Sequence, residues 1–265
     1  MDTVGAVLGP ALAMLLMYWL ANDISRVLWF AVAPAIIAVL LIVVGVEEPE
    51  GRHPRQGFRS PIRHDALRQF SGDYWRVVAV GAVFALARFS EAFLVLRAQQ
   101  AGLAVTWIPL VMVVMSVVYS VSALPAGMLS DRIGRRSLLV AGLMLLILAD
   151  LILAWAGSPL MVLMGVALWG LHMGFTQGIL AAMVADVTPE ELKGTAFGLF
   201  NLVSGLFMLS ASVMAGALWE SYGASITLCT GGVLSLVALV MLVWFGRERR
   251  AVKAPSSGGE RDTHA

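Results

Sequence analysis

Two opposite charges lie three residues apart in an otherwise apolar stretch, and they are the residues most able to do chemistry in this chain. Arg88 and Glu91 follow a run, 77–87, in which no residue is charged. An ionisable side chain in a bilayer core is costly unless it has a partner or lines a wet cavity. Glu91 is therefore a candidate proton carrier, and Arg88 a candidate for binding an anion or pairing with an acid. The alternative is an ion pair on one helical face that merely satisfies both groups.

His172 is a second candidate, in the apolar run 160–184. At about 100° per residue it shares one face with Trp169 and Thr176, and this face can line a cavity. The nearly opposite face suits close helix packing because it carries Gly170, Gly174 and Gly178. The simpler alternative is a buried histidine that bonds to a neighbouring helix.

Three single polar residues within apolar runs are weaker candidates for the same pathway: Gln177, Asn201 and Tyr119. Isolated polar side chains of this kind often only join helices through hydrogen bonds.

A short charged segment, 127–136, separates two long apolar runs. Its glycines allow the close approach and unusual backbone angles of a tight hairpin, and its arginines can hold helix ends at the level of the lipid headgroups. Its acid can accept hydrogen bonds at a helix start or pair with a neighbouring arginine. We single out Gly127, Asp131, Arg132, Gly134, Arg135 and Arg136. The alternative is a plain hairpin whose charges only follow the membrane surface.

The elements that carry these residues are membrane spans. The chain is 59% hydrophobic and 13% charged over 265 residues, which is too apolar for a water-soluble domain. A bilayer core about 30 Å thick needs roughly 20 apolar residues per helix, and this length predicts eight spans at about 1–21, 25–46, 74–98, 104–126, 137–157, 160–184, 195–219 and 224–246. Runs such as 143–148 do not alternate as barrel strands do. The predicted fold class is an all-α, polytopic membrane protein.

Basic residues gather on one side of these spans. The loop after the second span and its flank carry Arg52, Arg55, Arg59, Arg63, Arg68 and Arg76. The segment 127–136, Lys193 and the C-terminal tail fall on the same side, whereas the opposite ends hold Arg26 and Arg97. By the positive-inside rule we expect both termini and the long loop in the cytoplasm.

The segment 127–136 between two spans resembles the signature loop of the major facilitator superfamily of transporters. Gly5, Gly9 and Pro10 resemble the glycine–proline motif on the fifth helix of that family, which is found especially in proton-coupled exporters. The resemblance covers nearly the whole chain and implies that its spans correspond to the fifth to twelfth helices. The first four helices of the family are then missing.

This resemblance implies a division of the chain. Two membrane helices (1–46) end the N-terminal half, a basic cytoplasmic linker (47–73) follows, six helices (74–246) form the C-terminal half, and a tail (247–265) is disordered. In the family the signature loop grips the other half when the transporter faces outward. The seventh and tenth family helices line the central cavity, which places Arg88 and His172 there. Asp150 falls on a peripheral helix, where we expect a local structural partner.

The leading functional hypothesis is a secondary active transporter of a small organic solute that works by alternating access, with proton-coupled export as the favoured version. The expected partners are the lipid bilayer, the solute, protons and the missing helices, in the plasma (inner) membrane of a bacterium. The rival hypothesis is a truncated, non-transporting membrane protein or a partner that needs those helices. We expect no enzyme, because no nucleophile with a base is visible, and no nucleic-acid partner. We expect no metal or cofactor, because the histidines are dispersed: His53, His64, His172 and His264.

Overall fold

The computed structural model describes residues 2–45 and 67–253, and within these ranges the chain is helical, without a strand. The helices are α1 (Asp2–Trp19), α2 (Ile24–Gly45), α4 (Gly72–Ala87), α5 (Ala92–Gln100), α6 (Pro109–Ile133), α7 (Arg135–Ala154), α8 (Pro159–Asp186) and α9 (Lys193–Lys253). Short 3-10 turns, Val105–Trp107 and Glu190–Leu192, lead into α6 and α9. The predicted all-α fold class is confirmed.

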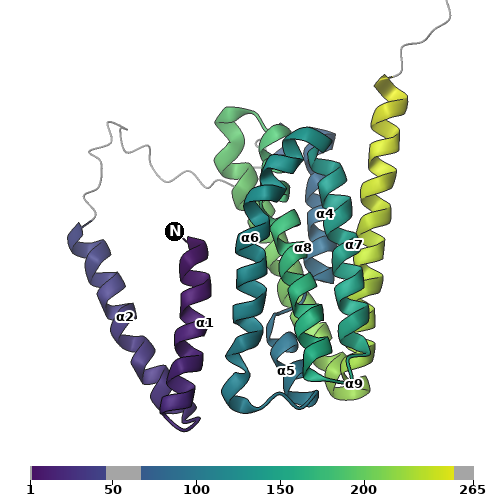
Figure 1. The fold of residues 1–265 in the computed structure, drawn as a ribbon. Coiled ribbons are helices and arrows are strands. Elements are labelled where there is room, and N and C mark those ends of the chain that lie inside the picture. The colour runs from purple at the N-terminus through teal and green to yellow at the C-terminus, as the bar shows by residue number, and fades with distance from the viewer. Residues whose placement is uncertain (1, 46–66, 254–265) are drawn as a thin grey trace, which may run out of the picture.

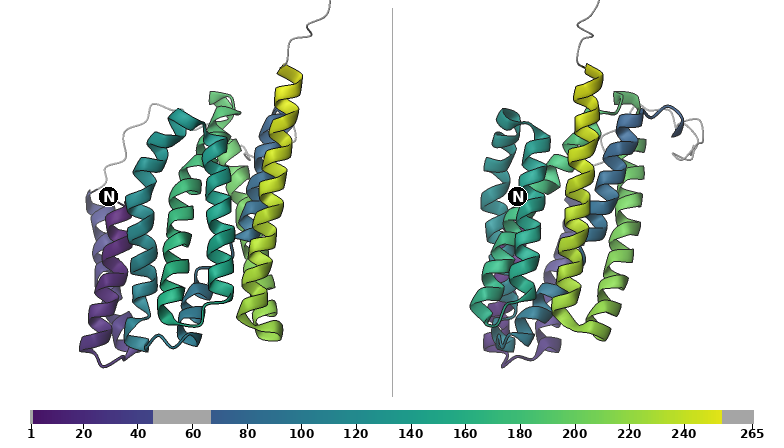
Figure 2. Two further views of the ribbon diagram at one scale, coloured as in Figure 1. Left: turned by 45° about the vertical axis from the view of Figure 1, so that its right-hand side comes forward. Right: turned by 90° about the vertical axis from the view of Figure 1, so that its right-hand side faces the viewer.

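Helices α4 to α9 form one bundle, and the α1–α2 hairpin lies at its side (Figure 1). Within the bundle, α8 packs against α6 and α7, and α9 packs against α4 and α7 (Figure 2). α1 packs along α6, whereas no described residue of α2 is buried although its mean hydropathy reaches 3.0. An apolar helix with no buried face is suited to contact lipid or further membrane helices.

The predicted spans are all helical in the structure. By length and composition, six helical stretches of the described chain can cross a membrane. The number differs from eight because the apolar part of α1, Gly5–Trp19, is short and because the last two predicted spans run together in α9. Gly223 breaks α9 between these two spans, with φ 81° and ψ 177°. Glycine reaches such a positive φ without a steric penalty.

The third predicted span is broken at the two charges. Its first part, α4, ends at Ala87, and Arg88 has the non-helical angles φ −103° and ψ 84°. Ser90 lies just before the second part, α5; its Oγ accepts from the Ala92 N–H at 3.3 Å and its carbonyl accepts from the Phe93 N–H at 3.1 Å. The expectation that Arg88 and Glu91 share the face of a continuous helix is therefore wrong.

The predicted linker and tail fall partly outside the described residues, namely at 47–66 and 254–265. At its C-terminal end the linker region passes into α4 at Gly72, where the Ser71 Oγ caps the helix by accepting from the Tyr74 N–H at 3.3 Å. The predicted tail begins as helix, because α9 continues to Lys253.

The C-terminal end of α7 is held by side chains from two other helices. Arg97 of α5 donates from Nε to the Leu153 carbonyl at 2.8 Å and from Nη2 to the Ala156 carbonyl at 2.7 Å. Ser225 of α9 donates to the Ala154 carbonyl at 2.7 Å. The last carbonyls of a helix lack intrahelical partners, and a cation is favourable there. Arg97 therefore ties α5 to α7 at this end of the bundle.

Replacing Arg97 by alanine is expected to lower the free energy of unfolding by about 1.5–3 kcal/mol, because half-buried carbonyls lose a charged donor. Equilibrium unfolding of the purified chain in detergent measures this change in the free energy of unfolding. Arg26→Ala is the matched control, since its side chain is 71% exposed in a surface pair with Asp23 and contributes little. Equal destabilisation by the two substitutions would contradict this role of Arg97.

Candidate functional site

A cavity of about 220 Å³ lies between α4, α8 and α9. Its lining is mostly apolar and includes Phe84, Leu180, Phe200 and Met208. Four polar side chains join this lining: Arg88, Gln177, Asn201 and Ser204. A mainly apolar cavity with few polar groups is the usual composition of a small-molecule site.

Arg88 is the centre of a polar network at this cavity. With the amide of Gln177 oriented to satisfy both of its ends, its oxygen accepts from Arg88 Nη1 at 3.2 Å and Nη2 at 3.1 Å. Its nitrogen then donates to the Tyr119 hydroxyl at 3.3 Å. The Glu91 carboxylate lies 3.8 Å from Arg88 Nη2, and the two side chains are 32% and 19% exposed. The guanidinium is thus held in place, and Glu91 is its one loosely placed counter-charge among the described residues.

The structure brings five of the six pathway candidates together. Arg88, Gln177 and Asn201 line the cavity, Tyr119 is joined to them through Gln177, and Glu91 is joined through Arg88. Ser204 and Phe200 also line the cavity but were not predicted as site residues. Helical spacing could have identified Ser204, because it follows Asn201 by three residues and lies on the same face of α9.

His172 is placed differently from its cavity-lining expectation. Its side chain is fully buried, its Nδ1 lies 2.9 Å from the Gly142 carbonyl of α7, and its ring packs 5.4 Å from Phe84. Trp169 and Thr176 on the same face are also fully buried. The expectation that this face lines a cavity is wrong, because α7 packs against it, and the simpler alternative of a buried, bonded histidine describes His172.

The opposite face of α8 packs closely on α6, as its glycines predict. A Cβ at Gly170 would collide with the backbone of Met115, and one at Gly174 would collide with Ser122. Gly178 has nothing within 4 Å and lines a second cavity of about 340 Å³ between α6 and α8.

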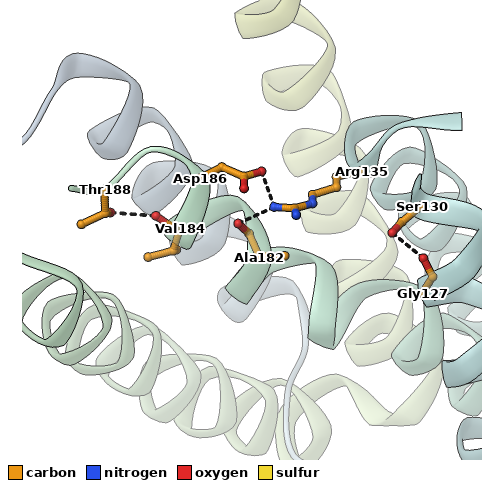
Figure 3. Close-up of polar contacts among 7 residues, drawn as sticks. All are labelled: Gly127, Ser130, Arg135, Ala182, Val184, Asp186 and Thr188. Carbon is orange, nitrogen blue, oxygen red and sulfur yellow. Dashed lines mark hydrogen bonds and ion pairs between the residues drawn. The ribbon is translucent and has the colours of Figure 1, made fainter. Parts of the chain in front are cut away.

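The predicted signature loop is shorter than expected, because α6 continues to Ile133 and only Gly134 separates it from α7. Gly134 has φ 84°, which favours glycine. Arg135 donates to the Ala182 carbonyl at 2.7 Å and pairs with Asp186, both near the C-terminus of α8 (Figure 3). The loop thus ties α7 to the end of α8.

The other four charged or glycine residues of the segment 127–136 contribute differently. Arg136 donates to the Leu242 and Val243 carbonyls of α9, at 2.7 Å each. Asp131 lines the cavities at this end but makes no hydrogen bond or ion pair within the described part of the chain, so the expected bond to a helix start or arginine is wrong here. Asp186 takes the place of Asp131 as the partner of Arg135. Gly127 accepts from the Ser130 hydroxyl at 2.7 Å, and Arg132 is exposed.

The glycine–proline motif lies in α1. Pro10 is inside the helix, and neither Gly5 nor Gly9 has another segment within 4 Å of a Cβ built on it. No other segment of the described chain therefore approaches α1 closely at these two glycines.

Asp150 of α7 also departs from expectation. Its side chain is fully buried, and neither carboxyl oxygen has a hydrogen-bond partner among the described residues. The expectation of a local structural partner is wrong. The side chain lies instead against two glycines of α9, Gly231 and Gly232.

Comparison with known proteins places this architecture in a family. The family model described as Major Facilitator Superfamily matches residues 92–264. An uncharacterized MFS-type transporter of Methanocaldococcus jannaschii is 29% identical over 251 residues, which are 92% of this chain and 61% of that protein. The proton myo-inositol cotransporter hmit-1.2 of Caenorhabditis elegans is 23% identical over 47% of this chain and 21% of its own length.

Shorter similarity extends to a bacterial transporter. The inner membrane transport protein YajR of Escherichia coli is 26% identical over 47% of this chain and 27% of its own length. The chain spans about three fifths of the length of the archaeal relative. With the family model matching residues 92–264 and the helices described above, this chain belongs to the major facilitator superfamily.

Proposed function

We propose that this chain takes part in secondary active transport of a small organic solute, and that the cavity at Arg88 forms part of the solute site. The observation that carries this proposal is a guanidinium held at the wall of an apolar cavity by the amide of Gln177. Ionisable residues within membrane spans mark solute and ion pathways, because they are otherwise costly. An arginine there suits a solute with a carboxylate or another anionic group.

The broken helix supports alternating access as the mechanism. Solute sites of secondary transporters are typically formed where membrane helices are discontinuous. Arg88 occupies such a position, because α4 ends at Ala87 and α5 begins at Ala92. A solute bound to Arg88 would contact the chain at the point where the helix direction can change.

Proton coupling is the version that we favour. The partly exposed Glu91 carboxyl is paired with Arg88 at 3.8 Å, so proton uptake by Glu91 would free the guanidinium for an anionic solute. One relative is named a proton cotransporter, which supports coupling to protons. Binding of a proton together with the anion corresponds to cotransport, whereas the resemblance of Gly9 and Pro10 to the exporter motif favours proton-coupled export.

Further helices would complete this transporter. The chain spans 61% of the archaeal relative, and α2 carries an apolar surface without a buried residue. By family resemblance, we infer that four preceding helices close the cavity opposite α8 and α9, with the turn at Gly134 facing them on the cytoplasmic side. We also place both termini in the cytoplasm and the protein in the inner membrane of a bacterium.

Proteoliposomes loaded with radiolabelled benzoate test the transport proposal. We expect the wild-type chain to move benzoate faster when a pH gradient is imposed, because Glu91 carries the coupled proton. Glu91→Gln is expected to remove this acceleration, since the amide carries no exchangeable acid proton, while slow exchange without a gradient is retained. Benzylamine, a cation of similar size, is the control solute.

Two results would count against the proposal. Absence of benzoate flux, with or without a gradient, together with absence of benzoate binding to the chain, would exclude an anionic solute of this class. Equal acceleration in the wild type and in Glu91→Gln would exclude Glu91 as the proton carrier while leaving the solute site in place.

A further inference from the structure

The carboxyl of Asp150 is buried in the seam between α7 and α9, away from the cavity lining. Asp150 is 0% exposed. Neither of its carboxyl oxygens has a hydrogen-bond partner within residues 5–45 and 67–245, where side chains are described. A buried carboxylate without a counter-charge or hydrogen bonds is very costly in a low-dielectric interior, and such a group binds a proton instead. The arrangement therefore selects the neutral acid.

The surroundings of Asp150 are built to hold this carboxyl closely. A Cβ on Gly231 would lie 3.1 Å from Asp150 Oδ2, and one on Gly232 would lie 3.6 Å from Asp150 Cβ. Glycine at both positions lets α9 approach the side chain. Ser235 lies on the same face of α9, one turn further on, and its buried Oγ is likewise unpartnered among the described atoms.

Phe89 connects this seam to the cavity. A Cβ on Gly231 would lie 2.6 Å from Phe89 Cε1, so the phenyl ring and the Asp150 carboxyl meet at the same glycine. Phe89 follows Arg88 directly and lies in the break between α4 and α5. A movement of Arg88 within this break therefore changes the packing over Asp150.

No charged side chain bonds to Asp150 in the described chain, and Arg97 of α5, which binds α7 three residues further on, donates to the Leu153 and Ala156 carbonyls instead. The break offers Arg88 and Glu91, which pair with each other. On α8, His172 bonds to α7 at Gly142, eight residues and about 12 Å from Asp150 along the helix. The facing surface of α9 offers Gly231, Gly232 and Ser235, and Cys229, two residues before Gly231 in the chain, is only partly buried.

We propose that Asp150 is a second proton-binding site, which holds its proton while Phe89 packs at Gly231 and releases it when that packing opens. On release the proton passes from the carboxyl to an entering water molecule, which carries it away as hydronium, and further entering water molecules solvate the carboxylate that remains. The proposal does not depend on the identity of the solute or on the role of Glu91.

Infrared spectroscopy of the purified full chain in lipid tests this proposal. With 13C-labelled aspartate, we expect the carbonyl band of a protonated carboxylic acid at neutral pH, and we assign this band to Asp150. The other aspartates with described side chains are at least partly exposed, so water can solvate their carboxylates: Asp23, Asp73, Asp131 and Asp186. Asp150→Asn is expected to remove the band, and Glu91→Gln is expected to leave it unchanged. Absence of the band in the wild type, or its persistence in Asp150→Asn, would overturn the proposal.

The link to Phe89 has its own readout. In Phe89→Ala, water can reach the carboxyl, so the acid band at neutral pH is expected to be weaker than in the wild type. An acid band of equal intensity in both proteins would overturn the coupling to the break. If Asp150→Asn does not fold, the labelled wild-type spectrum alone decides the protonation of Asp150. Loss of benzoate transport would not move either spectrum, so failure of the transport proposal is distinguishable.

Discussion

Replacing Arg88 by alanine is expected to weaken benzoate binding by about 10- to 100-fold. Removal of a charged hydrogen-bond donor costs about 1.5–3 kcal/mol, and each 1.4 kcal/mol is a factor of ten in affinity. Arg88 supplies this donor at the cavity wall, where Gln177 already orients the guanidinium. Equilibrium binding of radiolabelled benzoate to the purified chain in lipid nanodiscs measures the change.

Two controls make the result specific to the cavity. Arg88→Lys keeps the charge but loses the planar set of donors, so an intermediate affinity is expected. Arg26→Ala removes an exposed arginine and should bind benzoate as the wild type does. If Arg88→Ala retains wild-type affinity, the solute site does not include the guanidinium.

The second large effect is expected at the contact between α6 and α8. Gly170→Ala places a methyl group against the backbone of Met115, which cannot rotate away as a side chain can. Overpacking of this kind costs about 1–3 kcal/mol, and it opposes the gain of roughly 1 kcal/mol that alanine brings to a helix interior. Reduced thermal stability of the purified chain in detergent is the expected result.

Gly178→Ala is the matched control on the same helix. No atom lies within 4 Å of its Cβ position, so only the helix-propensity gain remains and stability should be equal or slightly higher. Opposite effects of the same substitution, eight residues apart, would assign the destabilisation to the α6–α8 contact. Equal destabilisation at both positions would show that α8 does not approach α6 as described.

The sequence predicted the fold well because membrane spans are specified by length and apolarity, which are local properties. Breaks within spans were harder to predict. The break at Arg88 leaves the apolar pattern unchanged, and the hydrogen bond from the Ala92 N–H to the Ser90 Oγ beside it is not visible in that pattern. The segment 127–136 was predicted as a loop because it is charged and contains glycine, but α6 continues through most of it to Ile133.

The candidate site was predicted in part. Arg88, Gln177 and Asn201 stood out as polar residues in apolar runs, and the structure places all three at one cavity. Helical periodicity tells which residues share a face but not what packs against it, and this is why His172 was expected in a cavity. For the same reason, the lack of a hydrogen-bond partner for Asp150 could not be predicted: the residues of α9 that surround it are more than 80 residues away in the chain.

The interruption after Ala87 has a mechanical consequence. α4 packs chiefly on α9, whereas α5 contacts α8 and is tied to the end of α7 by Arg97. The two pieces of one span thus belong to different groups of helices, and a change in helix direction at the junction between them would move one group relative to the other. A solute bound to the Arg88 guanidinium at this junction would therefore affect both groups of helices at once.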